Sequence, residues 1–486
     1  MINQKSLKTR FVKAIEALIS DLRDAKRYCQ KGCTKASVFE IFQHDFKFVR
    51  RRLKALAFAE VTNFSAKLKQ SRRSLKNNVR NSALCKKYFK KFANAKTRRS
   101  MAKIVIEQDK INYYTWKYPA FIRDKNEKCF IWFVPDWSNV WGGGHYTLFR
   151  FANYFANREG ITNIIYIYND TKRRDTKTIE NELRGALKNC KLKVIIDPNL
   201  LPKCDVIFAT TWQSAYDVKA FPYAKIKFYF MQDYESQFYA YGTRSMQANN
   251  SYKFGFYGIT GGTWLRQIFE SYGMEAQNYI FSTDKDIFYP ANNGKVRDEV
   301  LKIFFYGRPS TERRCFELGI AALAEIAELY PKIEIIIAGL QMDLEMPFKA
   351  TLLGNLSLKA TGDLYRTCDI GIAFSGTNLS YLPVELMASG CTVLTNNGPQ
   401  TEWYCNDHNV MLVDPVVAAV VDGFKKLYNS KELRQSLVNK GLEKSASTSW
   451  EKEMDKVYNF VAKKLMSHNS RGNAPHFVRH SPPSSN

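Results

Sequence analysis

Residues 380–393 read Ser-Tyr-Leu-Pro-Val-Glu-Leu-Met-Ala-Ser-Gly-Cys-Thr-Val. The stretch predicts a short apolar helix that carries one carboxylate, Glu385, near its start, ends at Gly390 and leads into an apolar strand over 392–395. A unit of loop, helix and strand suits a ligand site at the edge of a parallel sheet. Glu385 can accept hydrogen bonds from hydroxyl groups such as those of a ribose, although glutamate is also favoured at a helix start as a solvated acid.

Short apolar strands alternate with helices on both sides of this stretch, which predicts α/β domains with doubly wound parallel sheets. A polar segment over 290–295 separates two sets of strands and reads as a linker. Two such Rossmann-like domains would face each other across a cleft, where ligands bind at the carboxyl ends of the strands. The predicted strands cover 130–134, 164–168, 193–196, 206–210, 227–230 and 254–259 in the first set, and 301–306, 333–338, 370–374, 392–395 and 410–413 in the second.

The whole chain divides into five predicted segments. A C-terminal amphipathic stretch near 450–463 reads as a helix, and the residues after it are almost free of apolar side chains, as in disordered tails. The segments are a basic α-helical extension over 1–125, a first Rossmann-like domain over 126–292, a second over 293–446, a C-terminal helix over 447–466 and a disordered tail over 467–486.

The positive charge is concentrated at the N-terminus. The net charge is +27, and residues 1–100 hold 27 Lys and Arg against 6 Asp and Glu, which leaves a balance of only +6 for the rest. These residues are either a helical bundle with a basic outer face or a surface for an anionic partner, with the inner membrane leaflet as the first candidate and nucleic acid as the second. The near-neutral remainder argues against nucleic acid.

The cysteines and the apolar runs indicate a compartment. Ten cysteines are scattered without repeated Cys-x-x-Cys pairs, as expected in a reducing environment, and they do not predict a metal site. Apolar runs are far shorter than the ~20 residues of a membrane span, and the first residues do not resemble a secretory signal. We therefore expect a cytoplasmic protein, with peripheral attachment to the inner face of the cytoplasmic membrane through residues 1–100.

A glycine-rich turn follows the first predicted strand. Residues 141–147 read Trp-Gly-Gly-Gly-His-Tyr-Thr, and a helix is expected over 147–156. Gly142, Gly143 and Gly144 permit positive φ angles and a close approach of the backbone. With the amides of the following helix they would form a cradle for a diphosphate, whereas the alternative is an ordinary tight turn.

Two further stretches carry polar side chains at predicted strand ends. Residues 306–314 read Tyr-Gly-Arg-Pro-Ser-Thr-Glu-Arg-Arg, where Arg308 and Arg313 offer planar donors suited to phosphate oxygens or simply a solvated helix start. Residues 229–239 read Tyr-Phe-Met-Gln-Asp-Tyr-Glu-Ser-Gln-Phe-Tyr. Their acids can hold hydroxyl groups and their aromatic rings can stack on a sugar, although ordinary aromatic packing would also explain the rings.

Together these stretches resemble the retaining GT-B glycosyltransferases of family 4, in the right order over about 128–463. Glu385 matches the second acid of the family's donor-binding motif, while the first acid falls on Thr377. Arg308 matches the family's arginine, Arg313 takes the position of its lysine, and Gln232 stands where many relatives have histidine. The resemblance is closest to bacterial rhamnosyltransferases that build surface glycans such as rhamnan, O-antigen and S-layer glycan.

The resemblance implies that the first domain binds the acceptor, that the second binds a nucleotide sugar, and that the C-terminal helix packs back on the first. It implies transfer of L-rhamnose from dTDP-L-rhamnose to a growing or lipid-linked bacterial glycan with retention, without a cofactor or metal. The alternatives are a UDP- or GDP-hexose donor and, in another class, a nucleic-acid-binding or scaffold protein with an inactive fold. The implied site residues are Gly142, Gly143, Gly144, Arg308, Arg313, Ser380, Tyr381 and Glu385 for the donor; Gln232, Asp233, Tyr234 and Glu235 for the acceptor; and Asp233, Glu235, Arg308 and Arg313 for catalysis.

Overall fold

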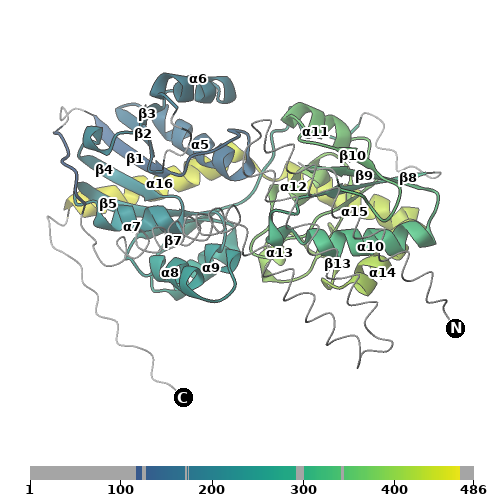
Figure 1. Cartoon of the computed structure of the whole chain (residues 1–486). Helices are drawn as coiled ribbons and strands as arrows, with labels where there is room; N and C mark the ends of the chain where they lie inside the picture. The colour runs from purple at the N-terminus through teal and green to yellow at the C-terminus, as the bar shows by residue number, and fades with distance from the viewer. Residues whose placement is uncertain are drawn as a thin grey trace, which may run out of the picture. The chain divides into compact units, whose positions relative to one another are not determined.

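The computed structural model describes residues 116–122, 127–169, 172, 174–291, 300–340 and 344–470. Apart from 116–122, the predicted basic extension lies outside these residues, so its helices and its attraction to a membrane stay predictions. The linker boundary predicted at 292–293 also falls outside them. In the described part, two parallel sheets with flanking helices form two lobes (Figure 1). We call residues 127–291 with the C-terminal helix the first lobe, and residues 300–446 the second lobe.

The sheet of the first lobe has seven strands in the order β3-β2-β1-β4-β5-β6-β7, and all neighbours are parallel. The chain adds β2 and β3 on one side of β1 and then β4 to β7 on its other side, as in doubly wound folds. The strands are β1 Lys128–Val134, β2 Ile161–Ile167, β3 Lys193–Ile195, β4 Cys204–Ala209, β5 Ala224–Met231, β6 Tyr257–Gly261 and β7 Ala276–Tyr279.

The second lobe repeats this plan with six parallel strands in the order β10-β9-β8-β11-β12-β13. Both predicted sets of strands are therefore confirmed, with shifts at their ends. The strands are β8 Leu301–Tyr306, β9 Ile333–Ala338, β10 Thr351–Leu353, β11 Ile370–Ile372, β12 Thr392–Asn396 and β13 Met411–Val413.

Helices cover both faces of each sheet, which is why the central strands are apolar throughout. Every residue of β2 is buried, and so is every residue of β1 except Lys128. Within the core, the rings of Trp132 and Phe208 stack at 3.8 Å. The helices are α5 Gly143–Ala156, α6 Thr176–Ala186, α7 Trp212–Ala220, α8 Thr243–Ser251, α9 Thr263–Ser271, α10 Phe316–Leu329, α11 Leu358–Tyr365, α12 Tyr381–Ala388, α13 Pro399–Glu402, α14 Val417–Asn429, α15 Lys431–Ala446 and α16 Trp450–Ser470.

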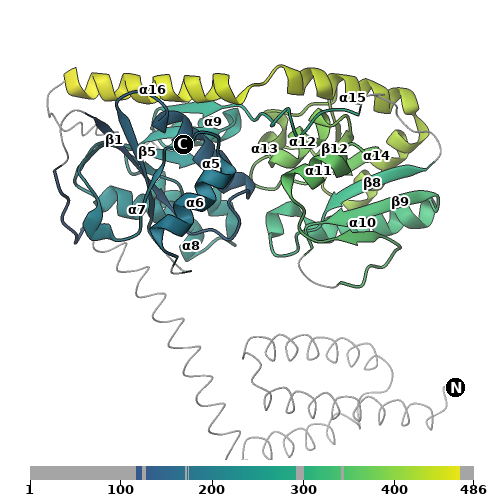
Figure 2. The same cartoon turned by 90° about the horizontal axis from the view of Figure 1, so that it is seen from above.

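The C-terminal helix α16 returns to the first lobe. Figure 2 shows it lying along this lobe, where it contacts β5, β7 and α5. Val457, Val461 and Leu465 are buried at a spacing of four residues, as expected for an amphipathic helix with one packed face. The helix runs to Ser470, past the predicted boundary at 466, although its last buried residue is Leu465. Residues 471–486 lie outside the described part.

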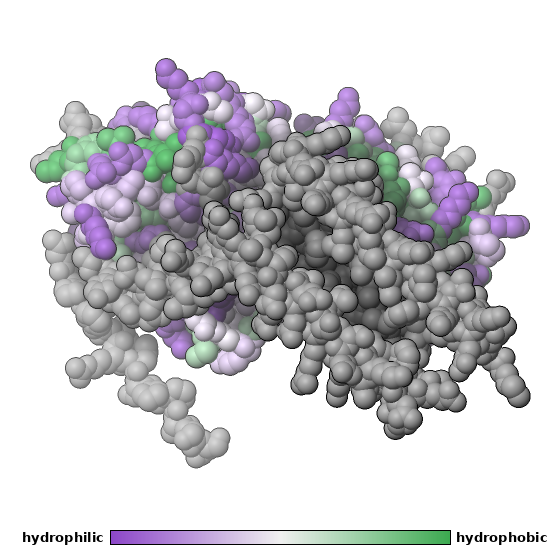
Figure 3. All heavy atoms as spheres, in the orientation of Figure 1, coloured by the Kyte–Doolittle hydropathy of each residue, from purple (hydrophilic) through white to green (hydrophobic). Residues whose placement is uncertain are grey.

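The described surface is mixed in character. On the face shown in Figure 3, hydrophilic residues predominate and hydrophobic residues lie between them. Within the described ranges, no helix combines the length and the apolar composition needed to cross a bilayer.

Candidate functional site

A cleft of about 1660 Å³ lies between the carboxyl ends of the strands of the two lobes. This volume exceeds the ~300–1,000 Å³ of ordinary small-molecule pockets, so the cleft has room for two ligands. The structure brings most of the predicted site residues together along its walls. Those that line it are Gly142, Gly143, Gly144, Gln232, Asp233, Glu235, Arg308, Arg313, Ser380, Tyr381 and Glu385.

The glycine-rich turn forms one wall and is already part of a helix. Helix α5 begins at Gly143, one turn before the predicted start at 147, so Gly143 and Gly144 supply amides of its first turn. Such amides lack partners within the helix and attract anions. The three glycines do not use the positive φ angles that they permit: Gly142 has φ −59°, and neither Gly143 nor Gly144 is left-handed.

The backbone of this turn does, however, approach a side chain of the other lobe closely. A Cβ atom on Gly143 would lie 3.2 Å from Cδ2 of Tyr381, which comes from α12 of the second lobe. Gln232 holds the turn from the other side, since its Nε2 donates to the carbonyl oxygen of Gly144 at 3.0 Å. The glycine turn is therefore fitted between the end of β5 and the start of α12.

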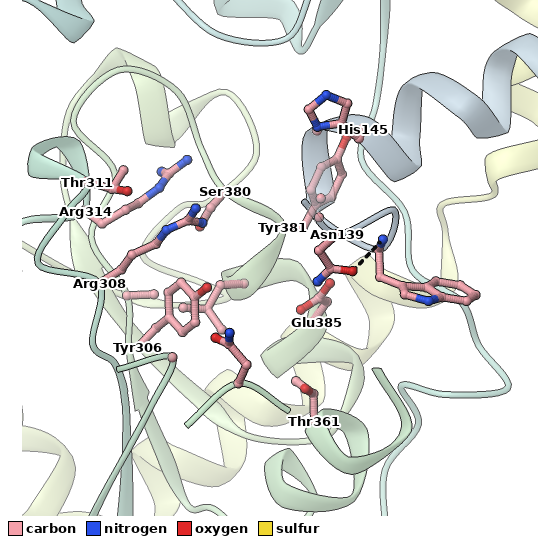
Figure 4. Close-up of a pocket in the computed structure, with 18 of the residues that line it drawn as sticks. Asn139, His145, Tyr306, Arg308, Thr311, Arg314, Thr361, Ser380, Tyr381 and Glu385 are labelled. Atoms are coloured by element: carbon pink, nitrogen blue, oxygen red, sulfur yellow. Dashed lines mark hydrogen bonds between the residues drawn. The ribbon is translucent and has the colours of Figure 1, made fainter. Parts of the chain in front are cut away.

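The arginine loop after β8 forms the opposite wall. Arg308 is exposed, and Figure 4 shows its guanidinium, with that of Arg314, directed into the cleft toward the side that carries Asn139, His145 and Tyr381. The loop ends in a short 3-10 turn over Glu312–Arg314. The prediction that an arginine of this loop faces the glycine turn across the gap therefore agrees with the structure.

Arg314 was not predicted as a site residue, although it lies deeper than its neighbours. Its Nη1 donates to Oγ of Ser375 at 3.3 Å and to the carbonyl oxygen of Asn378 at 3.2 Å. Burial lowers the pKa of Arg314 to about 10, and the positive charges of Arg313 and Arg308 act in the same direction, whereas Asp233 opposes them. A bound anion would relieve this crowding of positive charge.

Glu385 lies in the first turns of α12, and its side chain reaches the cleft (Figure 4). Burial, with a smaller contribution from the carboxylate of Asp284, raises its pKa to about 8. The alternative of a fully solvated acid at the helix start is therefore wrong. Thr377, at the position of the family's first acid, is buried and is not among the lining residues.

The two acids after β5 differ in their surroundings. Asp233 pairs with Arg313, whose Nε lies 3.3 Å from its Oδ2. Glu235 is only 8% exposed and accepts hydrogen bonds from the amide of Trp212 and the hydroxyl of Tyr229. Burial raises the pKa of Glu235 to about 8, which these two hydrogen bonds only partly offset. Asp233 is thus the carboxylate that a ligand can reach more easily, and Glu235 is suited to holding the neighbouring groups of the site in place.

Tyr234 does not take the predicted place in the acceptor site. It is not among the residues that line the cleft. Its hydroxyl lies 3.1 Å from that of Tyr272 and 3.3 Å from Oδ1 of Asn249, and its ring packs beside Tyr252 and Trp264. The aromatic packing considered as the alternative explains this residue, whereas Phe238 does line the cleft.

Asn378 joins the lobes at the base of the site and was also missed. Its Nδ2 donates to the carbonyl oxygens of Gln232 at 2.9 Å and Gly261 at 3.0 Å, both in the first lobe. Its Oδ1 accepts a hydrogen bond from Nε1 of Trp403 at 3.1 Å. The side chain is 1% exposed. Nothing in the sequence marks it, because its partners are distant backbone atoms.

His145 is a further wall residue outside the predicted set. Its Nε2 lies 3.2 Å from the carbonyl oxygen of Pro135, and its ring packs between Trp137 and Phe149. Burial lowers the pKa of His145, so it is neutral at pH 7 and can donate from this nitrogen to the carbonyl. The sequence feature that could have identified His145 as a site residue is its position directly after the three glycines.

Among the described residues, no group of three or more His, Cys, Asp and Glu side chains is arranged to hold a metal ion. The metal-free site stays a prediction.

The chain is similar to proteins of glycan synthesis. Residues 301–425 match the family model of the WsaF C-terminal domain. The chain is 38% identical over 338 residues to the O-antigen biosynthesis protein RfbC of Myxococcus xanthus, a match that covers 67% of this chain and 26% of that protein. The chain thus spans about a quarter of the length of this curated relative.

Solved structures with similar folds cover about 70% of the chain. Sucrose-phosphate synthase from Thermosynechococcus elongatus superposes with a TM-score of 0.55 at 12% identity, over 70% of this chain and 100% of that one. HepE of Anabaena in complex with UDP and glucose superposes with a TM-score of 0.52 at 15% identity, over 70% of this chain and 100% of that one. At these identities the likeness concerns the fold alone. The two Rossmann-like lobes of this chain therefore have the GT-B fold, as the sequence predicted.

Proposed function

We propose that the protein is a retaining glycosyltransferase that moves L-rhamnose from dTDP-L-rhamnose onto a growing bacterial cell-surface glycan. The observation that carries the proposal is the wall of the cleft where the guanidinium groups of Arg308 and Arg314 face the first turn of α5. A diphosphate fits such a site because guanidinium groups and helix amides both bind phosphate oxygens. The match to an O-antigen biosynthesis protein supports a surface glycan as the acceptor.

The proposal divides the cleft between the two substrates. The second lobe holds the nucleotide sugar, with Glu385 accepting a hydrogen bond from the 3′-hydroxyl of the nucleotide's deoxyribose and with Ser380 and Tyr381 beside the diphosphate. The first lobe presents Gln232, Asp233 and Glu235 to the acceptor. Because Glu235 is buried and already accepts two hydrogen bonds, it orients the acceptor site while Asp233 contacts the hydroxyl.

The reaction needs charge stabilisation more than a nucleophilic side chain. As the bond between the anomeric carbon and the diphosphate oxygen breaks, negative charge grows on the diphosphate, where the arginines and the α5 amides stabilise it. The acceptor hydroxyl attacks from the same face, and its proton passes to the departing phosphate oxygen. In this proposal the arginines supply the positive charge, and no metal ion takes part.

The test is a panel of nucleotide sugars offered to the full chain. Mass spectrometry of retained ligand and thermal unfolding should show that dTDP-L-rhamnose binds more tightly than UDP-glucose and GDP-mannose, and that its sugar is transferred to a lipid-linked acceptor. Preference for UDP-glucose would favour the other donor class, for which the HepE complex offers a precedent. If no nucleotide sugar binds, the result would favour the alternative of a scaffold protein with an inactive fold.

Binding of the donor should release a proton through Glu385. Burial raises the pKa of this carboxyl to about 8, above its ordinary 4.5, so it is mostly protonated at pH 7 before the donor binds. Hydroxyl groups that donate to the carboxylate favour its charged form and lower the pKa. Calorimetry at pH 7 in buffers of different ionisation enthalpy should detect up to about one proton released per nucleotide sugar.

Glu385→Gln is the control variant, because glutamine keeps the shape of the side chain and cannot ionise. The variant should bind the nucleotide sugar without this proton release. The affinity of the wild type for the nucleotide sugar should rise between pH 6 and 9, whereas that of the variant should not. Equal proton release by both proteins would contradict the role of Glu385.

A further inference from the structure

Arg313 reaches across the cleft and contacts the first lobe. Its Nε lies 3.3 Å from Oδ2 of Asp233, and its guanidinium carbon lies 4.1 Å from the centre of the Phe238 ring. Both partners follow β5, whereas Arg313 belongs to the loop after β8. The ion pair is partly buried, with the side chains of Arg313 and Asp233 exposed by 31% and 14%. Such a pair is screened less by solvent than a surface pair.

Both ends of this contact are anchored to the backbone of their own lobe. The carbonyl oxygen of Arg313 accepts a hydrogen bond from the amide of Gly376 at 2.9 Å. On the other side, Oδ1 of Asp233 accepts a hydrogen bond from the amide of Tyr234 at 3.0 Å. Both carboxylate oxygens of Asp233 therefore have a partner, and Oδ2 faces the guanidinium.

The charges around this pair are unbalanced. The positive charges of Arg308 and Arg313 both act on Arg314, and the negative charge of Asp233 partly offsets them. A diphosphate that enters between Arg308 and Arg314 adds negative charge close to Arg313. Since a guanidinium binds phosphate as well as carboxylate, the diphosphate and Asp233 compete for Arg313.

We infer that Arg313 is a cross-cleft latch that the donor releases, an inference that rests on the proposed function. Before the donor binds, Asp233 and Phe238 hold Arg313 on the acceptor side. When the diphosphate binds, Arg313 turns to it, and Oδ2 of Asp233 becomes free for the acceptor hydroxyl. The donor therefore binds first, and the acceptor site is completed by its arrival. Phe238 acts as a positioning residue, because its ring stabilises the latched guanidinium.

The latch predicts that removing an acid partner tightens anion binding. In the full chain, calorimetry with dTDP and with UDP should show that Asp233→Asn binds the preferred nucleotide about three- to tenfold more tightly than the wild type, because Arg313 no longer has to leave a carboxylate. Phe238→Leu should shift affinity in the same direction by a smaller factor. Arg313→Gln should weaken binding.

The double variant separates the latch from a general charge effect. In the Arg313→Gln background, Asp233→Asn should leave nucleotide affinity unchanged. Glu312→Gln removes an exposed acid next to Arg313 that does not line the cleft, and it should also leave affinity unchanged. Equal tightening by Asp233→Asn in both backgrounds, or no tightening in either, would overturn the latch and leave the proposed function standing. If the wild type binds neither dTDP nor UDP, both fail.

Discussion

Replacing Arg308 by alanine is expected to lower kcat for sugar transfer by about 100- to 1,000-fold, the usual cost of removing one donor that stabilises charge in a transition state. Arg308 is exposed, and its guanidinium is directed into the cleft (Figure 4). Because it makes no ion pair with any described residue, its removal should leave the free energy of unfolding within about 0.5 kcal/mol of the wild type. Steady-state kinetics and denaturant unfolding of the same preparation measure both quantities.

Arg184→Ala is the control for this variant. Arg184 is an exposed arginine on α6, and it pairs with Glu180 outside the cleft. It should keep the kcat of the wild type. Turnover of Arg308→Ala close to that of the wild type would remove Arg308 from the diphosphate site.

Gly262→Ala should be the most destabilising of the single substitutions considered, with a loss of about 3 kcal/mol in the free energy of unfolding. Gly262 precedes α9 with φ +97° and ψ 163°, a conformation almost restricted to glycine that costs other residues roughly 1–3 kcal/mol. A Cβ atom there would also lie 2.5 Å from the Trp403 ring of the second lobe. Overpacking of this kind adds about 1–3 kcal/mol.

Gly273→Ala separates the two causes. Gly273 has φ +84°, but no atom lies within 4 Å of a Cβ built on it, so this variant carries the backbone strain alone. Urea unfolding should therefore give Gly273→Ala a loss of only about 1 kcal/mol. Equal losses for the two variants would mean that the Trp403 contact adds nothing.

The fold was predictable because both sheets are buried on their two faces. Strands such as β1 and β9 are runs of apolar residues bounded by turns, and their order along the chain implies parallel sheets. Strand β7 was missed because it reads Ala-Gln-Asn-Tyr, and β10 because it has three mostly exposed residues. The early start of α5 was missed because glycines disfavour helices by propensity.

The sequence predicts which stretches form the site, but not which side chains contact each other. It places the glycine turn, the arginine loop and Glu385 near the ends of predicted strands, and parallel strands bring these ends to one edge of a sheet. The packing of Tyr234, the depth of Arg314 and the contact of Arg313 with Asp233 depend on which groups meet across the gap. No local pattern encodes those distances.

The buried carboxamide of Asn378 restricts how the cleft can open. It binds two carbonyl oxygens of the first lobe and an indole of its own lobe, and moving the lobes straight apart would break the two bonds to the carbonyl oxygens at a cost of about 0.5–1.5 kcal/mol each. Rotation about this point would widen the far rim while these bonds persist. We therefore expect substrates to enter by a pivoting motion with Asn378 near its axis.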